Sequence, residues 1–349
     1  MLRRCVPVFC LVALVVLTTP AFAKSDAKTL ELYSIDVEGG QSTLIVSPSG
    51  QSLLIDTGWP GYNGRDADRI VTAAKAAGIN HIDYVLITHY HRDHVGGVPQ
   101  LAARMKIGTF IDHGPNMEDI PTNVEDFAAY QKVLPGHGHM VAKPGDHLPI
   151  KGMDVQLISA AGSLIQHPLP GAGQPNPACA AEPKYPADTT ENARSLGVLI
   201  TFGKFRFLDL GDLTKDKEIA LMCPDNLIGK VDLFMVSHHG MDMSDTTALV
   251  AAIDPKAAIM NNGARKGGTP EVWQRVQKVV GPNRFWQLHY SIEGGTIYNV
   301  PEKFIANPDE KNDAGHYIKA IAYRNGTFEV VNSRNDAHVT YGAMPASRQ

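Results

Sequence analysis

"LITHYHRDHVGGV", residues 86–98, places three histidines and an aspartate (His89, His91, Asp93 and His94) within six positions, directly after a short apolar run. A single histidine is often an ordinary structural side chain, but a hydrophobic core has no use for three of them beside a carboxylate. Imidazole and carboxylate groups are ligands of Zn²⁺ and of other divalent first-row metals. The crowding therefore predicts a metal site.

The position of this cluster indicates a loop at the end of a strand. The preceding run "IDYVLITHY" is typical of a strand covered on both faces, and two glycines follow the last histidine. On an extended or looped backbone, His89 and His91 project the same way, while Asp93 and His94 turn toward a second point. That geometry suits two adjacent ions, at the carboxyl end of a strand where α/β sheets place active sites.

Two later segments bring further metal-capable residues to strand ends. "LGDL" contains Asp212 and "SHHG" contains His238 and His239, and each follows an apolar strand pattern. A lone Asp is often a turn residue and a lone His pair is usually on the surface. Three arrivals at strand ends instead predict that the segments meet at one edge of a sheet, and they disfavour a merely solvated His-rich turn.

Composition predicts a globular, exported protein. The chain has 349 residues, 44% hydrophobic and 19% charged, enough for one large domain or one and a half. Residues 1–23 combine two arginines, a short apolar stretch and a terminal "AFA", the pattern of a secretory signal peptide, with an uncleaved anchor as the alternative. We therefore expect a periplasmic or secreted protein that has no membrane association after cleavage.

Charge and cysteine content narrow the classes of partner. Loss of residues 1–23 leaves 30 basic against 36 acidic residues, which argues against a non-specific polyanion binder but permits a small phosphate ester. Two cysteines remain, Cys179 and Cys223. They form either a disulfide in an oxidising compartment or two buried thiols, and both alternatives stay open.

The pattern of elements predicts an α/β fold. Strand patterns and turn residues predict hairpins that turn at residues 48–50, at Gly203 and at Asn325–Gly326. Helical spacing is found over residues 64–79, 99–105 and 123–134, and a helix with Pro270 at its first position follows Thr269. Residues 167–190 lack periodicity and are expected to form a long surface loop or insertion.

These motifs resemble the metallo-β-lactamase superfamily, whose signature "HxHxDH" stands here at His89, His91, Asp93 and His94. The chain is most similar to the hydrolase domain of ComEC/Rec2-type competence proteins, through "DVEGGQ" from Asp36, "LLIDTG" with Asp56, "ENARSLGVLI", "LGDL" and "VSHHG". The resemblance implies a four-layer αββα sandwich over residues 29–280. Residues 281–349 would form a β-rich extension packed on the same domain.

The resemblance also implies roles for individual residues. His89 and His91 would bind a first metal, Asp93 and His94 a second, and Asp212 would bridge the two. His238 is our choice for the remaining ligand of the second metal, with His239 as the alternative. Asp56 would hold the ligand loop through hydrogen bonds. The cofactors would be two divalent ions, Zn or alternatively Mn.

Some positions depart from the family pattern. Asn192 stands where lactamase-like members have a histidine, so the first metal would be weakly held, completed by water, or Mn. Gln41 replaces the last acid of the competence motif, and its late "GHP" histidine is lost in "RKGGTP", which weakens the case for a nuclease. Four other histidines are candidates to compensate, although each is expected to be an ordinary loop or core residue: His113, His137, His139 and His289.

The expected function is hydrolysis by a metal-activated hydroxide of a phosphoester or a small ester, lactone or amide. Asp93 or Asp212 would accept the proton, and His239 or Tyr90 would act as electrophilic helper. A ComEC-like nuclease and a non-catalytic metal-binding protein are the alternatives. Substitution of His91 by alanine is predicted to abolish both ion uptake and turnover.

Overall fold

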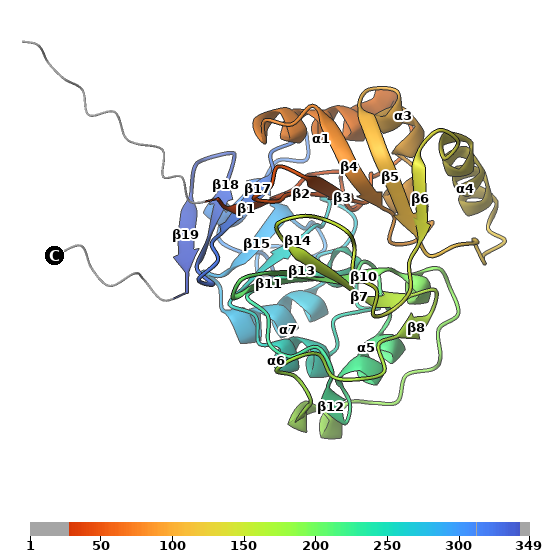
Figure 1. Ribbon diagram of the computed structural model, residues 1–349. Helices are drawn as coiled ribbons and strands as arrows, with labels where there is room; N and C mark the ends of the chain where they lie inside the picture. Colours follow the sequence, from red (N-terminus) through yellow and green to blue (C-terminus); the bar gives the residue numbers. More distant parts are fainter. Residues whose placement is uncertain (1–27, 312, 343–349) are drawn as a thin grey trace, which may run out of the picture.

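The computed structural model describes residues 28–311 and 313–342, so the predicted signal peptide, residues 1–23, lies outside the described residues. Two large β-sheets stack face to face, and helices cover the outer face of each (Figure 1). The four-layer αββα sandwich that the motifs imply is therefore confirmed.

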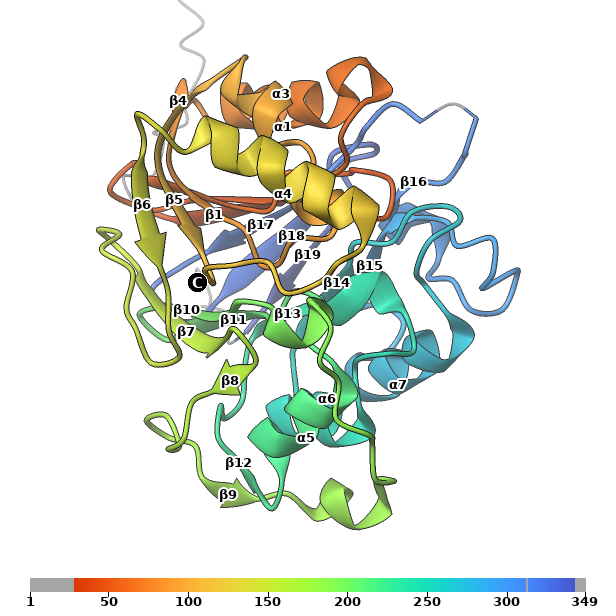
Figure 2. The same cartoon turned by 90° about the vertical axis from the view of Figure 1, so that its right-hand side faces the viewer.

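The first sheet has the order β19-β18-β17-β1-β2-β3-β4-β5-β6. Its strands are β1 (Leu30–Ser34), β2 (Thr43–Val46), β3 (Ser52–Ile55), β4 (His81–Leu86), β5 (Lys106–Asp112), β6 (Gly138–Val141), β17 (Ile318–Ala322), β18 (Phe328–Asn332) and β19 (His338–Tyr341). Strands β3 to β6 are parallel, and the remaining pairings are antiparallel. Helices α1 (Arg65–Ala76), α3 (Val98–Ala102) and α4 (Pro121–Val133) lie on its outer side (Figures 1 and 2).

The second sheet has the order β16-β15-β14-β13-β11-β10-β7-β8. Its strands are β7 (Asp154–Ala160), β8 (Ser163–Leu164), β10 (Gly197–Phe202), β11 (Phe205–Asp209), β13 (Leu233–Val236), β14 (Ala257–Met260), β15 (Phe285–His289) and β16 (Ile305–Asn307). Helices α5 (Lys215–Met222), α6 (Thr247–Ile253) and α7 (Pro270–Val280) cover it. The three predicted hairpins are present as β2–β3, β10–β11 and β17–β18, whereas α5 and α6 are helices that the sequence patterns did not predict.

Strand β3 shows how the first sheet is buried on both faces. Leu53 and Ile55 pack into the cluster between the two sheets, while Leu54 packs among the residues beneath the outer helices. Successive side chains of a strand point to opposite faces, so a strand with a layer on each side is apolar over most of its length. This double burial explains why its residues 52–55 are all buried.

A disulfide ties the expected irregular insertion to the end of helix α5. The few ordered elements of the insertion include the 3₁₀ turn η2 (Pro177–Ala181) and β9 (Gln174–Pro175), which pairs with β12 (Asp225–Asn226). Cys179 of η2 is bonded to Cys223, which follows α5. Both views place β12 beyond α5 and α6, at the far end from the first sheet (Figures 1 and 2). Of the two alternatives left open for the cysteines, the structure has the disulfide.

The C-terminal part of the chain contributes strands to both sheets. β15 and β16 pair in parallel onto β14, and β17 pairs with β1 of the first sheet. Neither sheet is complete without the residues that follow residue 280. The division of the chain at that residue stays a prediction. No helix among residues 28–311 and 313–342 has the length and apolar character needed to cross a membrane.

A second polar cluster joins the two sheets and helix α1. Asp36 follows β1 and accepts hydrogen bonds from Arg69 of α1 (2.6 Å) and His289 at the end of β15 (2.7 Å). Arg69 also pairs with Asp313, which is hydrogen-bonded to Glu38. Burial, the hydrogen bond to Asp313 and the nearby carboxylates raise the pKa of Glu38 to about 8. Glu38 therefore keeps its proton in the folded protein at neutral pH.

We predict that the proton held by Glu38 makes the stability of the fold depend on pH. A carboxyl whose pKa is raised by folding contributes stability that is complete below its unfolded pKa and is lost as pH rises through about 8. Between pH 6 and pH 9.5, the free energy of unfolding of the wild type should fall by about 1–2 kcal/mol more than that of Glu38→Gln. Chemical unfolding at the two pH values measures this difference, and parallel curves for the two proteins would contradict it.

Candidate metal centre

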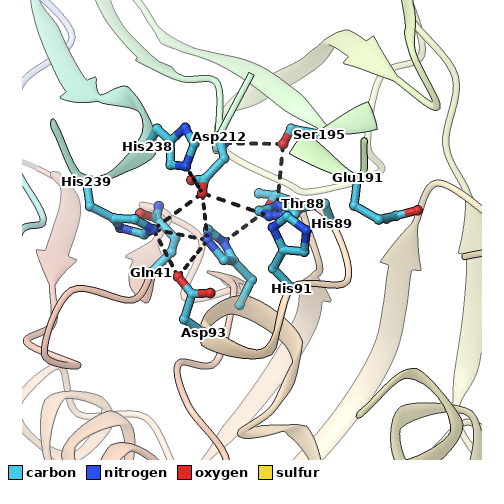
Figure 3. A network of polar contacts seen from close by, with 12 residues as sticks. Gln41, Thr88, His89, His91, Asp93, Glu191, Ser195, Asp212, His238 and His239 are labelled. Carbon is cyan, nitrogen blue, oxygen red and sulfur yellow. Dashed lines mark hydrogen bonds and ion pairs between the residues drawn. The ribbon is translucent and has the colours of Figure 1, made fainter. Parts of the chain in front are cut away.

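The predicted ligands all follow strands, and the structure brings them to one edge of the sandwich (Figure 3). The loop after β4 carries His89 and His91, and the short helix α2 (Arg92–Val95) carries Asp93 and His94. Asp212 follows β11, and the 3₁₀ turn η4 (Ser237–Gly240), which follows β13, carries His238 and His239. The predicted convergence of three strand ends is therefore observed, as expected for the carboxyl edges of parallel strands.

The two glycines after the histidine cluster allow the ligand loop to approach its neighbour closely. A Cβ added at Gly97 would lie 2.1 Å from the Thr57 carbonyl oxygen. The loop is also held by backbone bonds from the Thr57 amide to His94 (2.8 Å) and from the Gly97 amide to Gly58 (3.0 Å). Any side chain at position 97 would push the ligand loop away from residues 57–58.

Four side chains form a closed set of ligand atoms, which we call the metal set. It consists of Asp93 Oδ2, His94 Nε2, Asp212 Oδ2 and His239 Nε2. Five distances among these atoms fall between 3.1 and 3.4 Å. A regular tetrahedron of ligands about 2.0 Å from a zinc ion has edges of about 3.3 Å. The donor atoms and their spacing therefore fit one tetrahedrally coordinated divalent ion.

Asp212 occupies the centre of the wider site. Its Oδ2 lies 3.4 Å from His238 Nε2 and 3.9 Å from His89 Nε2, in addition to its contacts within the metal set. Figure 3 shows His239 and His89 on opposite sides of this carboxylate. His91 lies beside His89, with 4.6 Å between the ring centroids. This arrangement leaves Asp212 between the metal set and a second, more open group of histidines.

The outer nitrogens of His94 and His89 contact oxygen atoms, and these contacts orient the inner nitrogens. His94 Nδ1 lies 2.7 Å from Asp56 Oδ2, and His89 Nδ1 lies 3.1 Å from Thr88 Oγ1. Asp56 also accepts hydrogen bonds from the Thr88 amide and hydroxyl, both at 2.7 Å. Asp56 thus holds the ligand loop, as the resemblance implies. Partners of this kind fix the tautomer and direction of metal-binding histidines.

Electrostatics favours a cation at this position. Burial opposes the ionisation of Asp212, but His238, His94 and His239 outweigh it and hold its pKa well below the usual range. Burial also disfavours charge on His94, yet the carboxylates of Asp212, Asp93 and Asp56 raise its pKa well above normal. Three carboxylates therefore draw positive charge to the metal set, and a divalent cation supplies such charge.

Two neighbouring residues with unusual backbone conformations supply the last histidines. His238 has a φ of 53° and His239 a φ of 56°, both in the left-handed region that non-glycine residues seldom adopt. Such strain is most often kept where a site needs it. The resulting turn places His239 in the metal set and leaves His238 outside it. The spacing thus favours the alternative, His239, over our sequence-based choice of His238, and the ligand roles of both histidines stay predictions.

The more open group of histidines consists of His89, His91 and His238, and we call it the open group. It lacks the close spacing of ligand atoms found in the metal set. Among residues 28–311 and 313–342, neither His89 Nε2 nor the side-chain oxygen of Asn192 has a hydrogen-bond partner, although both atoms are buried. Tyr90 donates its hydroxyl proton to the Gly114 carbonyl and is fully buried, so its expected role as electrophilic helper has no support in the geometry. The other four candidate histidines bond elsewhere: His113 to Glu191, His137 to the Ile107 carbonyl, His139 to Asp112 and His289 to Asp36.

Three residues of the site were not predicted from the sequence. Glu118 Oε2 lies 2.9 Å from His91 Nε2, Glu191 accepts a hydrogen bond from the Tyr90 amide, and Lys266 forms an ion pair with Asp93. Glu191 directly precedes Asn192, which offered a local signal. Lys266 lies in "RKGGTP", which was noted only for its missing histidine, and Glu118 lies in a loop whose local pattern offered no signal.

We predict that Glu118 tunes the metal affinity of the open group. It also accepts a hydrogen bond from Asn123 (2.8 Å), and its second oxygen accepts one from the Glu191 amide (2.9 Å). A carboxamide cannot accept from both His91 and Asn123 with its NH₂ end. Glu118→Gln should therefore weaken uptake of the weaker-bound ion about 10- to 100-fold in chelator competition. Glu125→Gln, at an exposed position of α4, is the matched control, and equal affinities would contradict the prediction.

Comparison with known proteins agrees with this geometry. Residues 35–174 match the family model described as the metallo-beta-lactamase superfamily. The chain is 23% identical over 253 residues to Recombination protein 2 of Haemophilus influenzae, covering 72% of this chain and 26% of the relative. It is 24% identical over 251 residues to ComE operon protein 3 of Bacillus subtilis, covering 67% and 28%.

A third relative, hydroxyacylglutathione hydrolase of Xanthomonas axonopodis pv. citri, is 29% identical over 124 residues, covering 35% of this chain and 38% of the relative. The chain spans only about a quarter of the length of Recombination protein 2 and ComE operon protein 3, so the shared region is one part of those proteins. Residues 35–174, which carry the ligand loop, are thus similar to the metallo-β-lactamase superfamily.

Proposed function

We propose that the protein is an exported, metal-dependent hydrolase acting on a phosphoester or a small ester, lactone or amide. The observation that carries the proposal is the metal set, with its five interatomic distances of 3.1 to 3.4 Å. When bound, divalent cations activate water as a nucleophile near neutral pH and polarise the substrate oxygen under attack.

The residues of the chain would divide the remaining work. Asp93, His94, His239 and Asp212 would hold one ion, and His89, His91 and His238 would face a second, with Asp212 between the two. His239 then serves as a ligand in place of its expected role as electrophilic helper. Asp93 is the more exposed of the two carboxylates, at 9% against 3% for the side chains, so we assign it the proton of the attacking water.

Export is supported by the disulfide. Cys179 and Cys223 are joined, and disulfides persist mainly in secreted and periplasmic compartments. The signal-peptide pattern of residues 1–23 supports the same localisation. Retention of an intact Cys179–Cys223 bond in protein purified from the periplasm or medium would test the proposal, and reduced protein confined to the cytosol would count against it.

One experiment separates hydrolase, nuclease and binding protein. Purified mature protein is loaded with Zn²⁺ or Mn²⁺, its ion content is measured, and it is assayed on a chromogenic phosphodiester, a neutral ester, a lactone and DNA. About two ions per chain with turnover of a small substrate supports the proposal. Salt-sensitive DNA cleavage would instead indicate a nuclease. Similarity to Recombination protein 2 and ComE operon protein 3 favours this alternative. One ion or none without turnover would replace it by a binding protein.

A further inference from the structure

We infer that Lys266 binds the anionic oxygen of a phosphodiester substrate, so that the proposed hydrolase acts on phosphodiesters in preference to neutral esters. This inference rests on the proposed function and narrows its substrate class. It starts from a contact within the site: the Lys266 ammonium pairs with Asp93 Oδ2, an atom of the metal set. Among the ion pairs of the described residues, no other lysine or arginine contacts that set.

The backbone around Lys266 is held in place from two sides. The Gly268 amide donates to the His239 carbonyl (2.9 Å), and a Cβ added at Gly267 would lie 2.0 Å from that same carbonyl oxygen. On the other side, a Cβ added at Gly39 would lie 2.9 Å from the Lys266 Cβ. The loop that carries Lys266 therefore packs directly against the turn that carries His239. The position of the ammonium is built into the fold of the site.

Lys266 is also more exposed to solvent than the two carboxylates of the metal set. Its side chain is 30% exposed, whereas the side chains of Asp93 and Asp212 are 9% and 3% exposed. The ammonium lies 5.0 Å from the centroid of the Trp59 ring, which is half-buried. Trp59 and Lys266 thus present an aromatic face and a cation beside the metal set, where an incoming substrate would meet them first.

The charge balance favours an anion at this point. When a divalent cation takes up the charge of Asp93, Lys266 loses part of the attraction of its carboxylate partner. Even with Asp56 counted behind His94, two divalent cations and Lys266 outweigh the three carboxylates. A substrate that brings negative charge to the reacting centre restores the balance. Because the ammonium touches an atom of the metal set, that charge must lie on the reacting group itself.

A phosphodiester meets this requirement better than a neutral ester does. Its non-bridging oxygens carry charge before and during attack, so Lys266 would stabilise both the bound substrate and the transition state. A neutral ester develops charge only during attack, and a remote carboxylate would lie outside the reach of an ammonium bound to Asp93. The hydrolytic step itself breaks one P–O bond, forms another to the oxygen of water, and releases an alcohol and a phosphomonoester.

The test compares Lys266→Met, Lys266→Arg and a control on bis(p-nitrophenyl) phosphate and on neutral p-nitrophenyl acetate. Lys256→Met is the control, because this partly exposed lysine pairs with Asp232 away from the site. For Lys266→Met we expect kcat/KM on the phosphodiester to fall about 10- to 100-fold, largely through KM, with Lys266→Arg recovering most of it. On the neutral ester, which develops charge only during attack, kcat/KM should fall clearly less than on the phosphodiester.

Two readouts that do not depend on turnover complete the test. Calorimetric titration of metal-loaded protein with inorganic phosphate should show affinity at least about 10-fold weaker in Lys266→Met than in the wild type. Ion content should be unchanged or higher in that variant, because removal of a cation relieves repulsion of the metal. Equal phosphate affinities, equal losses on both substrates, or loss of bound metal would each overturn the inference. Lys266-dependent phosphate binding without turnover of any substrate would instead overturn the proposed hydrolase and leave the anion site standing.

Discussion

Asp212→Asn is expected to abolish turnover and to remove most of the bound metal. The Oδ2 atom of Asp212 faces four imidazole nitrogens, which belong to His89, His94, His238 and His239. Asparagine has nearly the same shape but no charge, and it presents either a neutral oxygen or an NH₂ group that cannot bind a cation. Loss of this shared carboxylate should lower kcat at least about 1,000-fold and reduce the ion content toward zero, because the ligand charge drawing both ions is lost.

Metal analysis and single-turnover assays measure these effects, and the control comes from the same region. Asp216→Asn changes a carboxylate that contacts Thr214 and Asp188 but none of the four histidines. That variant should keep both its ions and its turnover. If Asp212→Asn folded normally and kept two ions per chain, the proposed arrangement of ligands would have to be abandoned.

Loss of the disulfide should produce the largest change in stability. Cys179 and Cys223 are 44 residues apart in sequence, and the loop between them includes the second half of the irregular insertion together with β10, β11 and α5. In the chain-entropy account, a cross-link over a loop of this length contributes about 4 kcal/mol by restricting the unfolded chain. The free energy of unfolding of the double variant Cys179→Ser/Cys223→Ser should therefore be lower than that of the wild type by about this amount. Its unfolding midpoint should lie at a lower denaturant concentration.

Reduction of the wild type provides the matched control for this prediction. A thiol reductant should bring the unfolding midpoint of the wild type close to that of the double variant, and it should leave the double variant unchanged. The measurement is denaturant unfolding of the mature protein followed by circular dichroism. A double variant as stable as the oxidised wild type would show that the insertion is held by its other contacts alone.

The short helices show one limit of the sequence patterns. α6 has only seven residues, "TALVAAI", and α5 has eight. Helices of this length are marginal by themselves, so packing against neighbouring elements decides whether they form. Here, α5 and α6 pack against each other over the second sheet, and the disulfide lies at the end of α5. By contrast, α1 and α7 are longer and strongly amphipathic, and both occur close to their predicted bounds.

The choice between His238 and His239 shows another limit. Periodicity tells which side chains share a face only while the backbone keeps a regular conformation. Both residues adopt a left-handed φ, so their order in the sequence does not determine which one reaches the metal set. The distances of His239 Nε2 to Asp93 (3.1 Å) and Asp212 (3.4 Å) became visible only in the folded site.

The sequence by itself determined the fold class, the ligand loop after β4 and the arrival of Asp212 and the histidine pair at the same edge. These features follow from local patterns, because burial on both faces makes strands apolar and metal ligands must be crowded at their ends. Only the tertiary structure decided which histidine closes the metal set, that Cys179 meets Cys223, and that Glu118 and Lys266 lie beside His91 and Asp93. Lys266 and Asp93 are 173 residues apart, and a contact over such a distance depends on the stacking of two sheets, which no local pattern records.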